Sequence, residues 1–191
     1  MAAPFRTRPK PDGPAYVVNS DPRRLDAVYA KLLGEAAPLS DEVKWLAVTH
    51  KSFDHGRRGF NDRLAVLGRR VISLQTSLAL LNSTPSSTPA APDAYNRVPV
   101  AHPALAGLGG LTAETKAEVL SKARLAGLAE RYGLDKVTRW KPKKTDNLHG
   151  SGIEVVITTS LYAIVGAVAL EKGGHVAERV VREKILTPLG L

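Results

Sequence analysis

The feature that most constrains the fold of this chain is the row of apolar residues that follows Asn61. Its members recur at alternating steps of three and four, which is the repeat of one helix face: Leu64, Leu67, Val71, Leu74, Leu78 and Leu81. The spacing predicts a helix of roughly five to six turns that ends near Asn82. Because apolar surface is unstable in water, we expect this row to be buried against other helices.

The helix face nearly opposite the leucines carries Asp62, Ala65 and Arg69. At about 100° per residue these three positions lie within roughly 60° of one another. A nuclease helix can hold a magnesium ion at such a place with a column of carboxylates, because hard cations take oxygen ligands. Here the column holds one acid, one methyl group and one guanidinium.

Composition narrows the class of protein. The 191 residues are 43% hydrophobic, enough for one ordinary domain, and the absence of cysteine excludes disulfides and thiolate zinc sites. The net charge of +9 favours a polyanion such as RNA as partner, although a soluble protein with a merely basic surface is the alternative. No membrane span is expected, because the most apolar run, residues 155–170, is short and contains hydroxyl side chains.

The chain is predicted to have a flexible, extended basic arm over residues 1–21 and a helical domain over residues 22–191. The arm is rich in proline and offers Arg6, Arg8 and Lys10 to RNA; a mitochondrial targeting segment is the alternative, against which its prolines argue. Residues 83–110 are rich in Pro, Ser, Thr and Ala, which predicts an inserted loop, mobile or lying over a partner. The remaining helices are expected from Pro22 to Gly34, from Ser40, and over residues 113–132, 155–172 and 175–187.

The most basic stretch surrounds one tryptophan. Cations interleaved with an aromatic ring suit RNA phosphates and base stacking, so we assign RNA contact to Arg139, Trp140, Lys141, Lys143 and Lys144. A solvated basic loop is the plain alternative. By contrast, His50 is predicted to be a packed histidine at a helix end rather than a catalytic base.

The segment Asn61-Asp-Arg-Leu-Ala-Val-Leu-Gly-Arg69 resembles the signature of the ribonuclease III endonuclease domain, Asn-Glu-Arg-Leu-Glu-Phe-Leu-Gly-Asp. Five positions match it, and the three acids and the phenylalanine are replaced by Asp62, Ala65, Arg69 and Val66. Residues 46–53 and 162–171 resemble two further elements of the family. The resemblance runs in order through residues 25–190.

This resemblance implies an all-α, ribonuclease III-type helical bundle. The family cleaves double-stranded RNA with magnesium held by acids on two helices. Its four principal metal positions correspond here to Ala65, Arg69, Thr159 and Tyr162, with Asp62 as the remaining acid. We therefore expect no bound metal, no cofactor and no endonuclease activity.

The resemblance also implies partners. Family members pair through the signature helix, so we assign Val66 and Arg70 to a dimer interface. Because Val66 is smaller than the family's phenylalanine, a heterodimer with a second ribonuclease III-like subunit is expected, with a monomer covered by RNA or proteins as the alternative.

A degenerate, basic chain of this kind is similar to ribonuclease III-like proteins that serve as structural components of the fungal mitochondrial large ribosomal subunit. The expected function is then a scaffold in the mitochondrial matrix that contacts ribosomal RNA and other mitoribosomal proteins. Two alternatives stay open: a non-catalytic or regulatory subunit of a double-stranded RNA endonuclease, and a helical interaction module unrelated to RNA.

Overall fold

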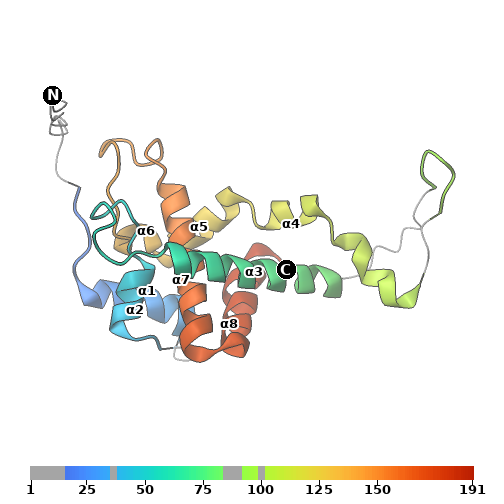
Figure 1. Cartoon of the computed structure of the whole chain (residues 1–191), viewed down its shortest axis with the longest axis horizontal. Helices are drawn as coiled ribbons and strands as arrows, with labels where there is room; N and C mark the ends of the chain where they lie inside the picture. The colour runs from blue at the N-terminus through green and yellow to red at the C-terminus, as the bar shows by residue number, and fades with distance from the viewer. Residues whose placement is uncertain (1–15, 35–37, 84–91, 99–101) are drawn as a thin grey trace, which may run out of the picture.

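The computed structural model describes residues 16–34, 38–83, 92–98 and 102–191. These ranges contain helices and a single isolated bridge between Thr49 and Arg139, with no strand, so the predicted all-α class is confirmed (Figure 1). The helices are α1 (Pro22–Leu33), α2 (Asp41–Ala47), α3 (Asp62–Asn82), η2 (Pro103–Gly110), α4 (Ala113–Val119), α5 (Lys122–Tyr132), α6 (Leu134–Val137), α7 (Ile153–Lys172), α8 (Gly174–Val181), η3 (Arg182–Leu186) and η4 (Thr187–Leu189).

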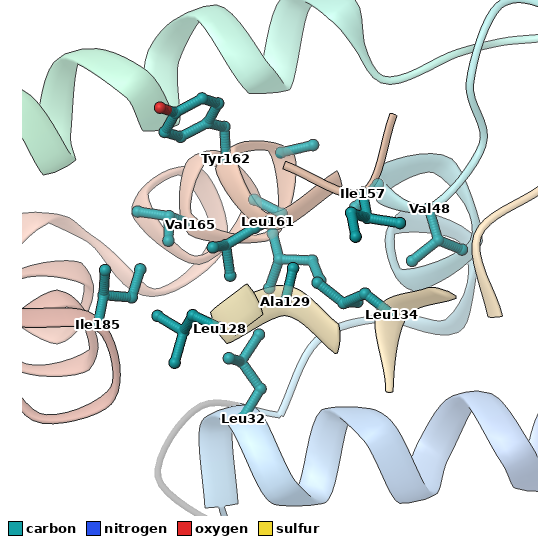
Figure 2. Packing of buried hydrophobic residues seen from close by; sticks show 14 of the residues in the cluster. Leu32, Val48, Leu128, Ala129, Leu134, Ile157, Leu161, Tyr162, Val165 and Ile185 are labelled. Atoms are coloured by element: carbon teal, nitrogen blue, oxygen red, sulfur yellow. The ribbon is translucent and has the colours of Figure 1, made fainter. Parts of the chain in front are cut away.

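Helix α7 is the centre of the fold. It packs against α3 most extensively, and against α8, α5, α2 and α6 on its other sides. Figure 2 shows Leu161 and Ile157 of α7 among side chains from the surrounding helices. By length and composition both α7 and α3 are apolar enough to cross a membrane, but 72% of the apolar window of α7 is buried inside the bundle, against 28% for α3. The apolar character of α7 is therefore used by the core.

Two glycines allow α3 and α7 to touch backbone to backbone. A Cβ atom at Gly68 would collide with the carbonyl oxygen of Tyr162 and lie 2.7 Å from the amide nitrogen of Gly166. A Cβ atom at Gly166 would collide in turn with the carbonyl oxygen of Leu64. Gly68 and Gly166 are therefore partners across the crossing.

This contact overturns the prediction that the leucine row is the buried face of α3. The buried residues of α3 are instead Ala65, Gly68, Ile72, Thr76 and Leu80. Leu74 is 58% exposed and Leu78 is 41% exposed, while the other members of the row are half-buried. The reason is that the small residues Ala65 and Gly68 let α7 approach on their side. The leucine row then lies at the margin of this contact, where Leu64 and Val71 still pack against the core and Leu74 and Leu78 are exposed.

The first helix has the ends that its local signals predict, whereas the residues before α2 and α3, Ser40 and Asn61, make no side-chain capping bond. Asp21 caps α1 by accepting a hydrogen bond from the amide of Arg23 at 2.9 Å, and Gly34 ends the helix with a positive φ of 61°, as predicted. Asn61 precedes α3 but makes no capping bond. It is fully buried and donates from Nδ2 to the carbonyl of Ala47 at 3.0 Å, with Ser160 Oγ 3.4 Å away.

The predicted helix over residues 113–132 is two helices, α4 and α5. Ser121 has extended backbone angles (φ −60°, ψ 145°) and stands at the N-cap of α5. The break lets α4 lie along α3 while α5 packs on α7. The last eight residues of the predicted 83–110 loop form η2, which also packs on α3; residues 84–91 and 99–101 lie outside the described residues. Together, α4, η2 and the 92–98 turn extend away from the bundle (Figure 1).

Candidate functional site

The five positions at which the resemblance places the family's acids lie together on the surface where α3 crosses α7. One pocket is lined by Asp62, Ala65, Val66, Arg69, Arg70 and Thr159. A second, adjoining pocket is lined by Arg69, Ser73, Leu120, Lys122, Val155, Thr158, Thr159 and Tyr162. Arg69 and Thr159 belong to both, so the pockets form one hollowed region.

Within this region the two helices contact each other through an arginine and a tyrosine. The crossing at Gly68 brings the next residue, Arg69, over the ring of Tyr162, with the guanidinium carbon 5.0 Å from the ring centre. Figure 2 shows Tyr162 at the margin of the core, between α7 and α3. Ala65, only 7% exposed, fills the space one turn before Arg69.

Two polar side chains of the region, those of Asp62 and Thr159, have local partners. Asp62, the one acid, forms an ion pair with Lys51 at 3.3 Å. Thr159 donates from its hydroxyl to the carbonyl of Val155 at 2.7 Å, one turn back along α7. Neither group is left unpaired for a ligand.

These residues do not fit a magnesium ion. Magnesium needs oxygen ligands, usually with carboxylates among them, and four of the five positions supply a methyl group, a guanidinium, a hydroxyl and a phenol. Among the described residues, no three His, Asp or Glu side chains come together as a metal site. The charge of Arg69 opposes a cation at the same place.

The phenol of Tyr162 stays protonated at neutral pH. Burial raises its pKa, and the nearby Arg69 lowers it by a smaller amount. A neutral phenol can donate a hydrogen bond. The pocket lined by Arg69, Lys122 and Tyr162 therefore presents hydrogen-bond donors and positive charge.

The predicted RNA-contact loop is well ordered, but its tryptophan faces inward. Trp140 is 2% exposed and donates from Nε1 to the hydroxyl of Tyr16 at 2.9 Å. The two rings meet edge to face at 5.8 Å. The expectation that Trp140 stacks on an RNA base is therefore wrong for this conformation, because the ring is already packed in the core.

Arg139 occupies an aromatic clamp at the start of this loop. Its guanidinium carbon lies 4.4 Å from the ring centre of Phe53 and 5.0 Å from that of Trp45. Burial lowers its pKa, with a smaller contribution from Arg58. Its backbone bonds to Val48 and His50, at 2.8 and 2.9 Å, fix the loop against the chain that follows α2. The side chain is thus held in place rather than free.

The three lysines of the loop are exposed. Lys141 donates its amide to Ser52 Oγ at 3.0 Å, and Lys144 exchanges two backbone hydrogen bonds with the hydroxyl of Ser151. These bonds fix the loop backbone while Lys141, Lys143 and Lys144 point their charges at solvent. Arg6, Arg8 and Lys10 lie outside the described residues.

The sequence does not predict two of the cations that lie near the crossing of α3 and α7. Lys122 lines the pocket beside Thr159, and Lys51 pairs with Asp62. No sequence signal places Lys122 there, because its position depends on the break between α4 and α5.

The chain belongs to the ribonuclease-III-like family, which it matches over residues 40–189. Its fold is that of the nuclease domain of ribonuclease III from Campylobacter jejuni. One structure of that domain superimposes with a TM-score of 0.62 at 20% identity, covering 87% of this chain and 96% of the other. A second gives a TM-score of 0.58 at 22% identity, covering 84% and 95%. At these identities the likeness establishes the fold alone.

The relatives in sequence are ribosomal proteins. The chain is 48% identical over 177 residues to large ribosomal subunit protein mL57 of Neurospora crassa, an alignment that covers 92% of this chain and 66% of that protein. It is 25% identical over 178 residues to large ribosomal subunit protein mL57 of Schizosaccharomyces pombe, covering 91% and 74%. The chain thus spans about two thirds of the length of the Neurospora relative.

Proposed function

We propose that this protein is a structural component of the large subunit of the mitochondrial ribosome, located in the matrix, where it contacts ribosomal RNA and neighbouring proteins. The observation that carries the proposal is the 48% identity to the Neurospora ribosomal protein over nearly the whole of this chain. The net charge of +9 agrees with a partner rich in phosphate.

RNA contact is assigned to the exposed lysines 141, 143 and 144 and to the basic residues of the N-terminal arm. The described chain begins at Tyr16. Its ring packs on Trp140, which belongs to the same loop as the three lysines. Tyr16 therefore lies against the loop that carries the lysines. Trp140 supports this arrangement as an anchor and takes no part in base stacking.

We propose further that the chain has no endonuclease activity. The pairing of Arg69 with Tyr162, and of Asp62 with Lys51, leaves no carboxylate set for magnesium. The test is incubation of the purified full chain with duplex RNA and magnesium, where no cleavage is expected. Magnesium-dependent cleavage that disappears in Asp62→Asn would contradict this part of the proposal.

The outward face of α3 is proposed to bind a second ribonuclease III-like subunit. Val66 is 64% exposed, Arg70 is exposed beside it, and Leu74 and Leu78 continue the apolar surface along the helix. The variant Val66→Asp should reduce co-purification of the partner, while Arg131→Asp, at an exposed position of α5, should not. A monodisperse homodimer of the purified chain in light scattering would contradict a heterodimer.

Sedimentation tests the ribosomal role directly. A lysate of the source organism is separated on gradients at moderate and high salt, and each fraction is probed for this protein. Co-migration with the mitochondrial large subunit that persists at high salt is the expected result. Migration as a small free complex would contradict it and favour the alternative, a non-catalytic or regulatory subunit of a double-stranded RNA endonuclease.

A further inference from the structure

The pocket beside the former metal positions has the composition of an anion site. It has a volume of about 450 Å³ and is lined by two cations, Arg69 and Lys122, and by four hydroxyl-bearing residues: Ser73, Thr158, Thr159 and Tyr162. Among the described residues that line it there is no carboxylate. The pocket is therefore electropositive and rich in hydrogen-bond donors.

Arg69 is held at the pocket by a cation–π contact with Tyr162, its guanidinium carbon lying 5.0 Å from the ring centre. This contact needs none of the N–H donors, which lie in the plane of a guanidinium. Within the described part of the chain, Arg69 forms no ion pair. Its fork of donors is thus positioned and unused, and such a fork matches two oxygens of a phosphate.

Lys122 supplies the second charge from the start of α5. Its ammonium lies 3.2 Å from the carboxylate of Glu154, in a pair whose side chains are 55% and 39% exposed. Exposed pairs of this kind contribute little stability. Lys122 can therefore turn from Glu154 to an anion in the pocket at small cost.

The hydroxyl groups of the pocket also favour an anion, because they can donate hydrogen bonds. The phenol of Tyr162 is held neutral by burial and can donate. Thr158 Oγ1 is buried and has no hydrogen-bond partner. A buried hydroxyl without a partner is unfavourable, and because Thr158 lines the pocket, an acceptor bound there is a candidate partner for it.

We propose that this pocket binds a phosphate of an RNA backbone, so that Arg69 occupies with a fixed charge the place where an active member of the family holds its metal. The assignment of this phosphate to RNA rests on the proposed ribosomal function. The chemistry itself, a phosphate dianion or phosphodiester held by an arginine fork and a lysine, rests on the pocket alone.

The test measures affinity of the full chain for a short RNA duplex by fluorescence anisotropy at fixed salt. Arg69→Ala should weaken binding about tenfold, since hydrogen bonds to a charged group are among the stronger ones. Arg63→Ala removes the same charge from an exposed position on the same helix outside the pocket and should change affinity less than about threefold. Lys122→Gln provides an independent second variant, and melting curves verify that each protein is folded.

Equal losses of RNA affinity in Arg69→Ala and Arg63→Ala would overturn the proposal, because the affinity would then depend only on the net charge of the chain. A melting temperature of the wild-type chain that rises with inorganic phosphate, combined with equal RNA affinity in the two variants, would also overturn the assignment to an RNA backbone. Sedimentation separates these failures from failure of the proposed function. If the wild-type chain and Arg69→Ala both migrate with the large subunit, the ribosomal role stands without the pocket.

Discussion

At the scale of single residues, Gly68 and Gly166 determine which face of α3 meets α7. Each occupies a position where a side chain would enter the backbone of the facing helix. The contact also sets the register that brings Arg69 over Tyr162. The same two residues thus fix both the packing and the character of the site.

Gly68→Ala should lower the free energy of unfolding by about 3 kcal/mol, because the added methyl group meets backbone that cannot move aside. Gly127→Ala is the matched control in α5, where a Cβ atom has open space, and should stabilise the chain by up to about 1 kcal/mol. Denaturant unfolding of both variants measures the difference. If Gly68→Ala and Gly127→Ala had similar free energies of unfolding, α3 and α7 would be able to move apart for the added methyl group without loss of stability, and the prediction would be wrong.

His50 should make the fold sensitive to acid. Burial lowers its pKa below the ordinary 6.5, against a smaller raising effect of Asp62. Below pH 6.5 the unfolded chain therefore binds more protons than the native chain, so the free energy of unfolding falls as the pH falls. His50→Gln should lose less stability than the wild type between pH 7 and pH 5 in thermal melts, and equal losses would count against the argument.

At the scale of elements, Asn61 joins the end of α2, the start of α3 and the middle of α7. Its backbone N–H donates to the carbonyl of Thr49, and its side-chain amide donates to the carbonyl of Ala47. Asn61→Ala should reduce stability by about 1–3 kcal/mol, because the carbonyl of Ala47 loses its buried donor. Asn82→Ala, at the exposed opposite end of the same helix, should change stability by less than about 0.5 kcal/mol. Thermal unfolding compares the two.

The sequence predicts the position of the main helices because their ends carry local signals. Asp21 and Gly34 bound α1, and Gly173 follows α7 as expected. It does not predict which face of α3 is buried, because that depends on the close approach of Gly166 from another helix. The inward turn of Trp140 and the break at Ser121 likewise depend on contacts distant in sequence.

For the candidate site as well, the sequence predicts some properties and leaves others to the folded structure. The residue types at positions 65, 69, 159 and 162 are visible in the sequence, and in the structure these residues line two adjoining pockets. The stacking of Arg69 on Tyr162 and the approach of Lys122 require the folded chain. Electrostatic character was therefore predictable, whereas the shape of the pocket was not.

At the scale of the whole molecule, binding to RNA should depend steeply on salt. Each phosphate contact made by a cation releases counterions and adds about one to the slope of log affinity against log salt. Replacing Lys143 and Lys144 with Gln should reduce that slope by about two, while replacing the exposed Lys31 and Lys172 should leave it nearly unchanged at the same net charge. Anisotropy titrations at several salt concentrations measure the slopes; equal slopes would remove the loop from the RNA contact.

The exposed apolar surface of α3 and η2 has a consequence for the life of the chain in the cell. Leu74, Leu78, Leu105 and Leu108 remain in contact with water in the isolated protein, and surfaces of this kind attract chaperones and proteases. Copies made in excess of their partner are therefore expected to be short-lived. If the proposed partner subunit covers α3, the abundance of the chain would be set by the supply of that partner rather than by the rate of its own synthesis.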